Sequence, residues 1–167
     1  AVRLKTGKTC VVAFLMNRWD ANQPAFKDLL LGVSDALRDT DYHMIVLPES
    51  VEGDRLETLR YVVDRGLADA MVITHTTPQD PRVRYLMERN FAFCTHGRTR
   101  LLDDGLARDP FGHAHSFVDF ANEQYAQASV EALVARGRKK LAILLPREGG
   151  TFRMHLLEGF MQACEQA

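Results

Sequence analysis

Polar and aromatic side chains gather just after several short apolar runs of this chain. The candidates for ligand contacts among them are Trp19, Phe26, Glu49, His75, His96, Arg98, Asp119 and Asn122. Aromatic rings cover the apolar face of a sugar ring, while carboxylate, amide and guanidinium groups form paired hydrogen bonds with hydroxyls. These residue types together predict a binding site for a small polar ligand.

The sequence shows no arrangement that is typical of catalysis or metal binding. It has neither a G-x-S-x-G elbow nor a G-x-G-x-x-G loop, and Gly7-Lys8-Thr9 precedes an apolar run instead of following one. The histidines lack cysteine or acidic partners at metal-ligand spacing, so ordinary loop histidines are expected. We therefore expect a binding protein with no enzymatic activity, no cofactor and no metal.

The elements that must position the candidates alternate between two kinds of pattern. Short apolar runs predict buried strands over residues 10–15, 43–47, 70–74, 91–95, 116–118 and 141–145. Helical stripes run from Phe26 to Leu37, Leu56 to Val63, Val83 to Met87, Tyr125 to Leu133 and Phe152 to Cys164. This order predicts an α/β fold, a doubly wound parallel sheet with helices on both faces, in which ligands bind beyond the carboxyl ends of the strands.

Proline and glycine residues agree with the predicted starts and ends of the helices. Pro24 and Pro81 suit the first turns of two helices, and Gly66 and Gly137 suit the ends of two others.

Composition excludes some partners and favours one compartment. The net charge of −1, with no basic stripe, argues that these residues alone do not bind DNA. No apolar run is long enough for a membrane span. The three cysteines are odd in number and far apart, which favours a reducing cytoplasm.

Six segments resemble motifs of the lactose-repressor (LacI/GalR) family, in the family's order. They are residues 3–9 (RLKTGKT), 23–26 (QPAF) with Leu29, Leu30 and Gly32, 69–73 (DAMVI), 117–120 (FVDF) with Asn122, 136–142 (RGRKKLA) and 158–160 (EGF). The resemblance covers nearly the whole chain.

The resemblance implies a periplasmic-binding-protein-like type I lobe and a ligand-sensing role. Residues 1–9 would be a linker after a hinge and a DNA-binding headpiece that this chain lacks. Residues 10–146 would form the N-terminal lobe, and 147–167 the start of a truncated C-terminal lobe. Family members bind a small effector, often a sugar, between the lobes, form homodimers and bind operator DNA through the headpiece. We expect Tyr61 or Tyr85 on the dimer surface.

The family's effector-contacting arginine stands three positions before the glycine of its G-F pair, where this chain has Leu156. Arg153, one turn earlier on the same face, or the adjacent His155 is the expected substitute.

Two other functions stay open. A solute-binding protein of a transport system has the same fold but needs a signal peptide, and no apolar signal core follows the basic start of the chain. An enzyme on a doubly wound sheet is the second alternative, because a fold alone does not decide function.

Overall fold

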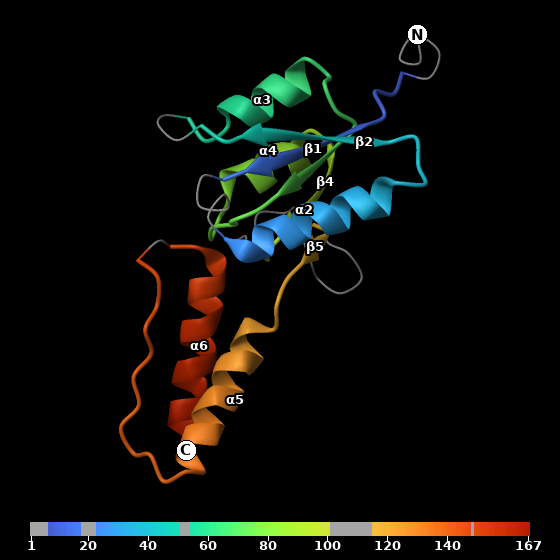
Figure 1. Ribbon diagram of the computed structural model, residues 1–167. Coiled ribbons are helices and arrows are strands. Elements are labelled where there is room, and N and C mark those ends of the chain that lie inside the picture. The colour runs from blue at the N-terminus through green and yellow to red at the C-terminus, as the bar shows by residue number, and fades with distance from the viewer. Residues whose placement is uncertain (1–6, 18–22, 51–53, 101–114, 148) are drawn as a thin grey trace.

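Five parallel strands form the centre of the computed structural model (Figure 1), which describes residues 7–17, 23–50, 54–100, 115–147 and 149–167. The strands are β1 (Val11–Met16), β2 (His43–Pro48), β3 (Ala70–Ile73), β4 (Ala92–His96) and β5 (Phe117–Val118). Their order is β2-β1-β3-β4-β5, and every neighbouring pair is parallel. The predicted α/β fold class is confirmed.

Helices cover both faces of this sheet because β1 presents apolar side chains to both sides. Ala13 and Leu15 lie in the main core with Leu59 of α3 (Glu57–Asp64) and Leu86 of α4 (Pro81–Glu88). Phe14 points to the opposite face. Its ring meets that of Phe26 from α2 (Pro24–Leu37) edge-on, with 5.6 Å between the ring centres. The first three predicted helices are therefore confirmed.

Local sequence sets the helix limits as predicted. Pro24 and Pro81 stand in first turns, where the missing N–H costs no hydrogen bond. Gly66 and Gly137 have φ of 56° and 75°, the left-handed conformation that ends helices and favours glycine.

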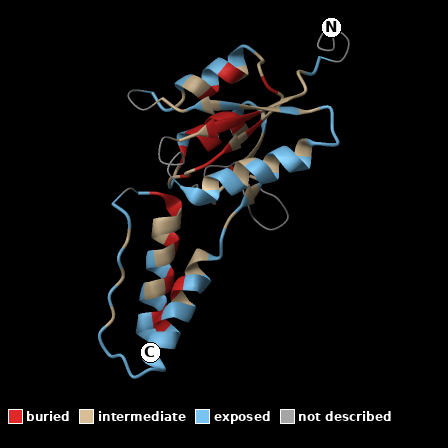
Figure 2. Ribbon diagram, in the orientation of Figure 1, coloured by how far each residue is buried: buried red, intermediate tan, exposed pale blue. Residues whose placement is uncertain are grey.

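Helices α5 (Asn122–Val134) and α6 (Thr151–Gln166) pack against each other at one end of the sheet (Figures 1 and 2). Their buried residues are mostly small: Ala126 and Val130 on α5, and Thr151, His155, Gly159 and Ala163 on α6. A Cβ on Gly159 would lie 2.3 Å from the carbonyl oxygen of Glu123, so the backbones approach closely.

The predicted stripes on α5 and α6 do not match the buried faces. The side chains of Tyr125 and Leu133 are 71% and 41% exposed, and Cys164 is exposed. Compared with the predicted stripes, the buried face is shifted by one residue toward the C-terminus on α5 and by one residue toward the N-terminus on α6. Close backbone approach selects small residues, and these do not stand out as apolar.

Residues 141–145 form no strand, so that prediction is wrong. This segment returns from the end of α5 to the start of α6, and Leu144 is 99% exposed. A strand needs a neighbour for its hydrogen bonds, and none of the described strands lies beside it.

No helix in the described ranges is both long and apolar enough to cross a bilayer.

Candidate functional site

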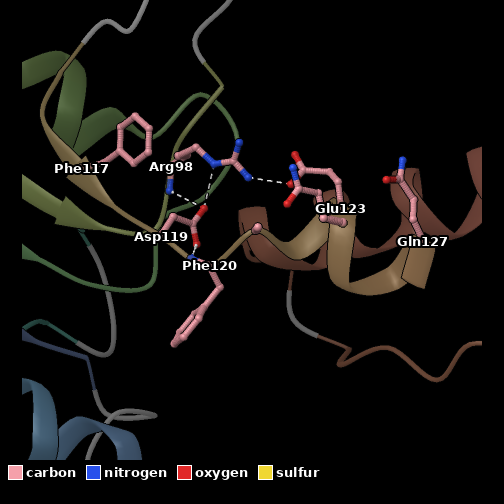
Figure 3. A pocket seen from close by; sticks show the side chains of 8 residues that line it. Arg98, Phe117, Asp119, Phe120, Glu123 and Gln127 are labelled. Carbon is pink, nitrogen blue, oxygen red and sulfur yellow. Dashed lines mark hydrogen bonds and ion pairs between the residues drawn. The ribbon is translucent and has the colours of Figure 1, made fainter. Parts of the chain in front are cut away.

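An arginine links the end of the sheet to the helix pair. Arg98 follows β4, Asp119 follows β5, and Glu123 lies in the first turn of α5. The Arg98 guanidinium donates from Nε to Asp119 Oδ2 at 2.9 Å and from Nη2 to Glu123 Oε2 at 2.7 Å (Figure 3). The backbone N–H of Arg98 also donates to Asp119, at 3.2 Å. These bonds join the residue after β4 to the segment between β5 and α5, which lies 21 to 25 residues further along the chain.

Asn122 and His155 complete this cluster. The amide of Asn122 donates to Asp119 Oδ1 at 3.2 Å, so Asp119 is held from both sides. His155 of α6 is 4% exposed, and its Nδ1 lies 3.4 Å from Arg98 Nη2. Burial lowers the pKa of His155, and the neighbouring carboxylates of Glu123 and Asp119 only partly oppose this. An unprotonated ring accepts the Arg98 hydrogen bond at Nδ1.

The Glu123 carboxylate stays ionised in this setting. Partial burial would raise its pKa, but the hydrogen bond from Arg98 and the positive charge of Arg98 outweigh that effect, and the pKa is lowered. We call Arg98, Asp119, Asn122, Glu123 and His155 the crossover cluster.

An open pocket of about 560 Å³ lies against the crossover cluster (Figure 3). It is lined by Arg98, Phe117, Asp119, Phe120, Ala121, Glu123, Gln124 and Gln127. The Phe120 ring is 69% exposed. The lining thus combines an aromatic face with amide, carboxylate and guanidinium groups, which are the partners that polyhydroxylated ligands require. Glu123, Gln124 and Gln127 were not predicted, because they lie within a helix and not directly after a strand.

Glu49 belongs to a second cluster, built around Arg82. Arg82 and Asp80 are fully buried, and the Glu49 side chain is 8% exposed. Arg82 bonds Glu49 Oε1 and Asp80 Oδ2, while Nη2 also donates to the carbonyl oxygens of Thr74 and His75, each at 3.1 Å. Asn17 donates to Glu49 Oε2 at 2.9 Å. Both Glu49 oxygens therefore already have protein partners.

Mutual charge stabilises this buried cluster. Burial would raise the pKa of Asp80 and lower that of Arg82. Their shared hydrogen bonds and opposite charges outweigh burial, so the pKa of Asp80 is lowered and that of Arg82 is raised. Arg82 was not predicted from the sequence. A signal was present, because a cation in the first turn of a helix opposes the helix dipole and calls for nearby carboxylates.

The other predicted residues lie in different places. His96 is the last residue of β4, and its ring meets that of Phe120 edge-on at 6.0 Å, beside the pocket. His75 has φ of 55°, and its ring faces Phe152 of α6 at 6.4 Å. Phe26 packs on Phe14. Trp19 lies outside the described residues.

Arg153 has a buried Nε with no hydrogen-bond partner among the described residues. It is not among the residues that line the pocket beside Arg98. The structure thus brings together Arg98, Asp119 and Asn122, with His96 beside the pocket, and it places Glu49 and the His75 carbonyl in the Arg82 cluster.

A second set of contacts joins the sheet to α6. The hydroxyl and the N–H of Thr151 donate to the carbonyl oxygen of Thr76 at 2.8 and 2.9 Å. Arg100 forms a two-point ion pair with Glu158, at 2.7 and 2.8 Å. Within the described ranges, no group of three or more His, Cys, Asp or Glu side chains is placed to hold a metal ion.

Comparisons with known proteins agree with this architecture. The HTH-type transcriptional regulator RafR of Escherichia coli is 26% identical over 168 residues, which cover 99% of this chain and 47% of RafR. A regulatory protein of the LacI family from Chloroflexus aggregans superposes with a TM-score of 0.76 at 21% identity, covering 95% of this chain and 53% of that one. The transcriptional regulator CelR, in complex with cellobiose, gives a TM-score of 0.76 at 17% identity, covering 95% and 47%.

This chain therefore spans about half the length of the proteins that it resembles, and those proteins are transcriptional regulators, not enzymes. Residues 8–167 match the family described as periplasmic binding proteins and sugar binding domain of LacI family. The extent of that match shows that the chain belongs to this family, as part of the effector-binding domain of a LacI-type regulator.

Proposed function

We propose that this chain senses a sugar or a related polar metabolite for a transcription regulator, and that the pocket beside the crossover cluster holds the effector. The observation that carries the proposal is the pairing of an exposed aromatic ring, Phe120, with the Arg98 and Asp119 side chains on the wall of one pocket. The likeness to CelR, whose structure contains cellobiose, supports a sugar as the effector class.

The side chains of the pocket have distinct roles in this proposal. Asp119 and Arg98 bind effector hydroxyls, Asn122 holds Asp119 in place, and Phe120 with His96 beside it presents an aromatic face. Glu49 acts indirectly, because it does not line the pocket and its oxygens are held by Arg82 and Asn17. Phe26, His75 and Arg153 are not among the residues that line this pocket, and Trp19 stays a prediction.

Effector binding is relayed to DNA by a change in lobe arrangement. Helices α5 and α6 pack together and meet the sheet through Thr76–Thr151 and Arg100–Glu158, so we place the lobe boundary near Phe120, earlier than residue 146. Movement at this boundary would be transmitted through a homodimer to a headpiece on operator DNA. Coupling between two such sites is typically about 1–3 kcal/mol.

The dimer surface needs exposed apolar side chains. Tyr61 is 51% exposed and stays a candidate for that surface, whereas Tyr85 is 6% exposed, so its predicted place on the dimer surface is wrong. The three cysteines are free thiols in the structure, which supports a cytoplasmic location for the regulator.

A thermal-shift screen of the full-length protein tests the proposal. The ligands are cellobiose, maltose and fructose, with sugar acids, polyols and nucleobases as other classes. We expect a saturable rise in melting temperature for a sugar, weakened by Asp119→Ala and by Arg98→Ala. Arg100→Ala is the matched control, because Arg100 also pairs with a glutamate but does not line the pocket. A hit that is equally sensitive to Arg100→Ala, or no hit with any sugar, contradicts the proposal.

A further inference from the structure

We propose that Glu123 is a specificity-determining residue that makes the pocket select uncharged sugars over their phosphorylated or carboxylated forms. This inference rests on the proposed function and names the effector's charge class, which neither the family match nor the fold specifies.

The charge balance of the pocket lining points to an uncharged ligand. Three charged side chains line the pocket, the carboxylates of Asp119 and Glu123 and the guanidinium of Arg98. Their formal sum is −1. Arg98 directs Nε at Asp119 and Nη2 at Glu123, so the positive charge of the wall is bound on two sides by carboxylates. A phosphate group entering here would approach two carboxylates and have to compete with them for one guanidinium.

The cations and imidazole near this cluster do not offset the negative charge. Arg100 lies two residues further along the chain, but both of its terminal nitrogens bond the carboxylate of Glu158. His155 is buried, its Nδ1 faces the Arg98 guanidinium, and its Nε2 lies 3.9 Å from Glu123 Oε1. Burial lowers the pKa of the ring below its ordinary value of 6.5, although the nearby carboxylates oppose this, so the ring carries no charge at neutral pH.

Glu123 determines the selectivity for uncharged sugars better than Asp119 does, because Asp119 also holds the local backbone in place and Glu123 does not. Asp119 accepts bonds from the backbone N–H groups of Arg98 and Phe120 and from the Asn122 amide, so it also builds the turn after β5. Glu123 projects from the first turn of α5, is 29% exposed and accepts its hydrogen bond from Arg98. Its charge can therefore be removed without dismantling the turn.

The test compares uncharged and phosphorylated forms of the same sugar on the full-length protein. Calorimetric titrations use three matched pairs: glucose and glucose 6-phosphate, fructose and fructose 6-phosphate, and cellobiose and cellobiose 6-phosphate. We expect the wild-type protein to bind the uncharged form of at least one pair about tenfold or more tightly, the scale of one unfavourable charge contact. Glu123→Gln should narrow that ratio about tenfold, and Glu123→Lys should reverse the preference.

Glu131→Gln is the matched control, because it makes the same change in net charge at an exposed glutamate of the same helix, outside the pocket lining. This control should leave the ratio of the affinities for the uncharged and the phosphorylated form unchanged. Added salt should shrink that ratio only when Glu123 is present, because salt screens the repulsion between charges. Tighter binding of a phosphorylated form by the wild-type protein overturns the inference but leaves the sensor function intact. An equal ratio in Glu123→Gln and wild type also overturns it. No binding of any sugar in the three pairs contradicts the proposed sugar effector, and the inference falls with it.

Discussion

Two arginines of this chain are each bound by two carboxylates, and their surroundings separate their roles. Arg82 is fully buried, with Asp80 and Glu49 buried beside it and two backbone carbonyls as further acceptors. The Arg98 side chain is 30% exposed, and its partners Asp119 and Glu123 line an open pocket. The first cluster ties together the ends of β2 and β3 and the start of α4, while the second faces solvent.

The contrast indicates that similar arrangements of charged side chains serve folding or binding according to what else surrounds them. A buried guanidinium with every neighbour supplied by the protein resists exchange with a ligand, and its loss leaves two buried carboxylates without compensation. A partly exposed guanidinium keeps one side open, so a ligand can replace water there. We therefore assign stability to the Arg82 cluster and effector binding to the crossover cluster.

Removing the buried guanidinium of Arg82 should have the largest effect on the free energy of unfolding. We expect Arg82→Met to lower the free energy of unfolding by about 3–5 kcal/mol, because Glu49 and Asp80 would remain buried and unpaired. Urea denaturation of the variant measures this. Arg98→Met is the control, with an expected loss of about 1 kcal/mol or less for a partly exposed pair. Equal losses in the two variants would contradict the contrast between the clusters.

The helix pair offers the next largest effect. Gly159→Ala places a Cβ 2.3 Å from the Glu123 carbonyl oxygen, which forces α5 and α6 apart. We expect a net loss of about 1–3 kcal/mol in unfolding free energy, typical of overpacking.

Gly32→Ala is its control, because a Cβ on Gly32 in α2 would meet no atom within 4 Å. That change should stabilise the protein by about 0.5–1 kcal/mol through helix propensity. If both alanine variants were stabilised alike, the close packing of α5 on α6 would be wrong.

Much of the fold follows from the sequence because each β-strand of the sheet is a contiguous apolar run. Residues 141–145 show the limit, since they are as apolar as β3 but have no strand beside them in the described chain. Part of the site could also be predicted from the sequence, because Arg98 and Asp119 come within two residues of the ends of strands. Arg82 and Glu123 could not, because both lie within helices and not after strands, and each bonds a residue that is distant in sequence, Glu49 and Arg98 respectively.

The smallest expected effect is a pH dependence within the crossover cluster. The pKa of His155 lies below its ordinary value of 6.5, mainly because the ring is buried. The unfolded chain then binds a proton more readily than the folded one, so the unfolding free energy should fall as the pH drops below 6.5. The slope for one proton is at most about 1.4 kcal/mol per pH unit. Urea denaturation at several pH values measures this slope.

His155→Gln should flatten the dependence in that range. His43, which is exposed on β2, provides the comparison variant, His43→Gln, and it should leave the slope unchanged. A slope that persists in His155→Gln would show that other groups cause it.

The central claim is that the crossover cluster binds the effector and the Arg82 cluster stabilises the fold. Hydrogen–deuterium exchange on the full-length protein, with and without the sugar that gives the largest thermal shift, tests this directly. We predict slower exchange over residues 116–127, around Asp119 and Glu123, and little change over 80–90, around Arg82. Slower exchange over 80–90 with none over 116–127 would place the effector elsewhere and contradict the assignment of effector binding to the crossover cluster.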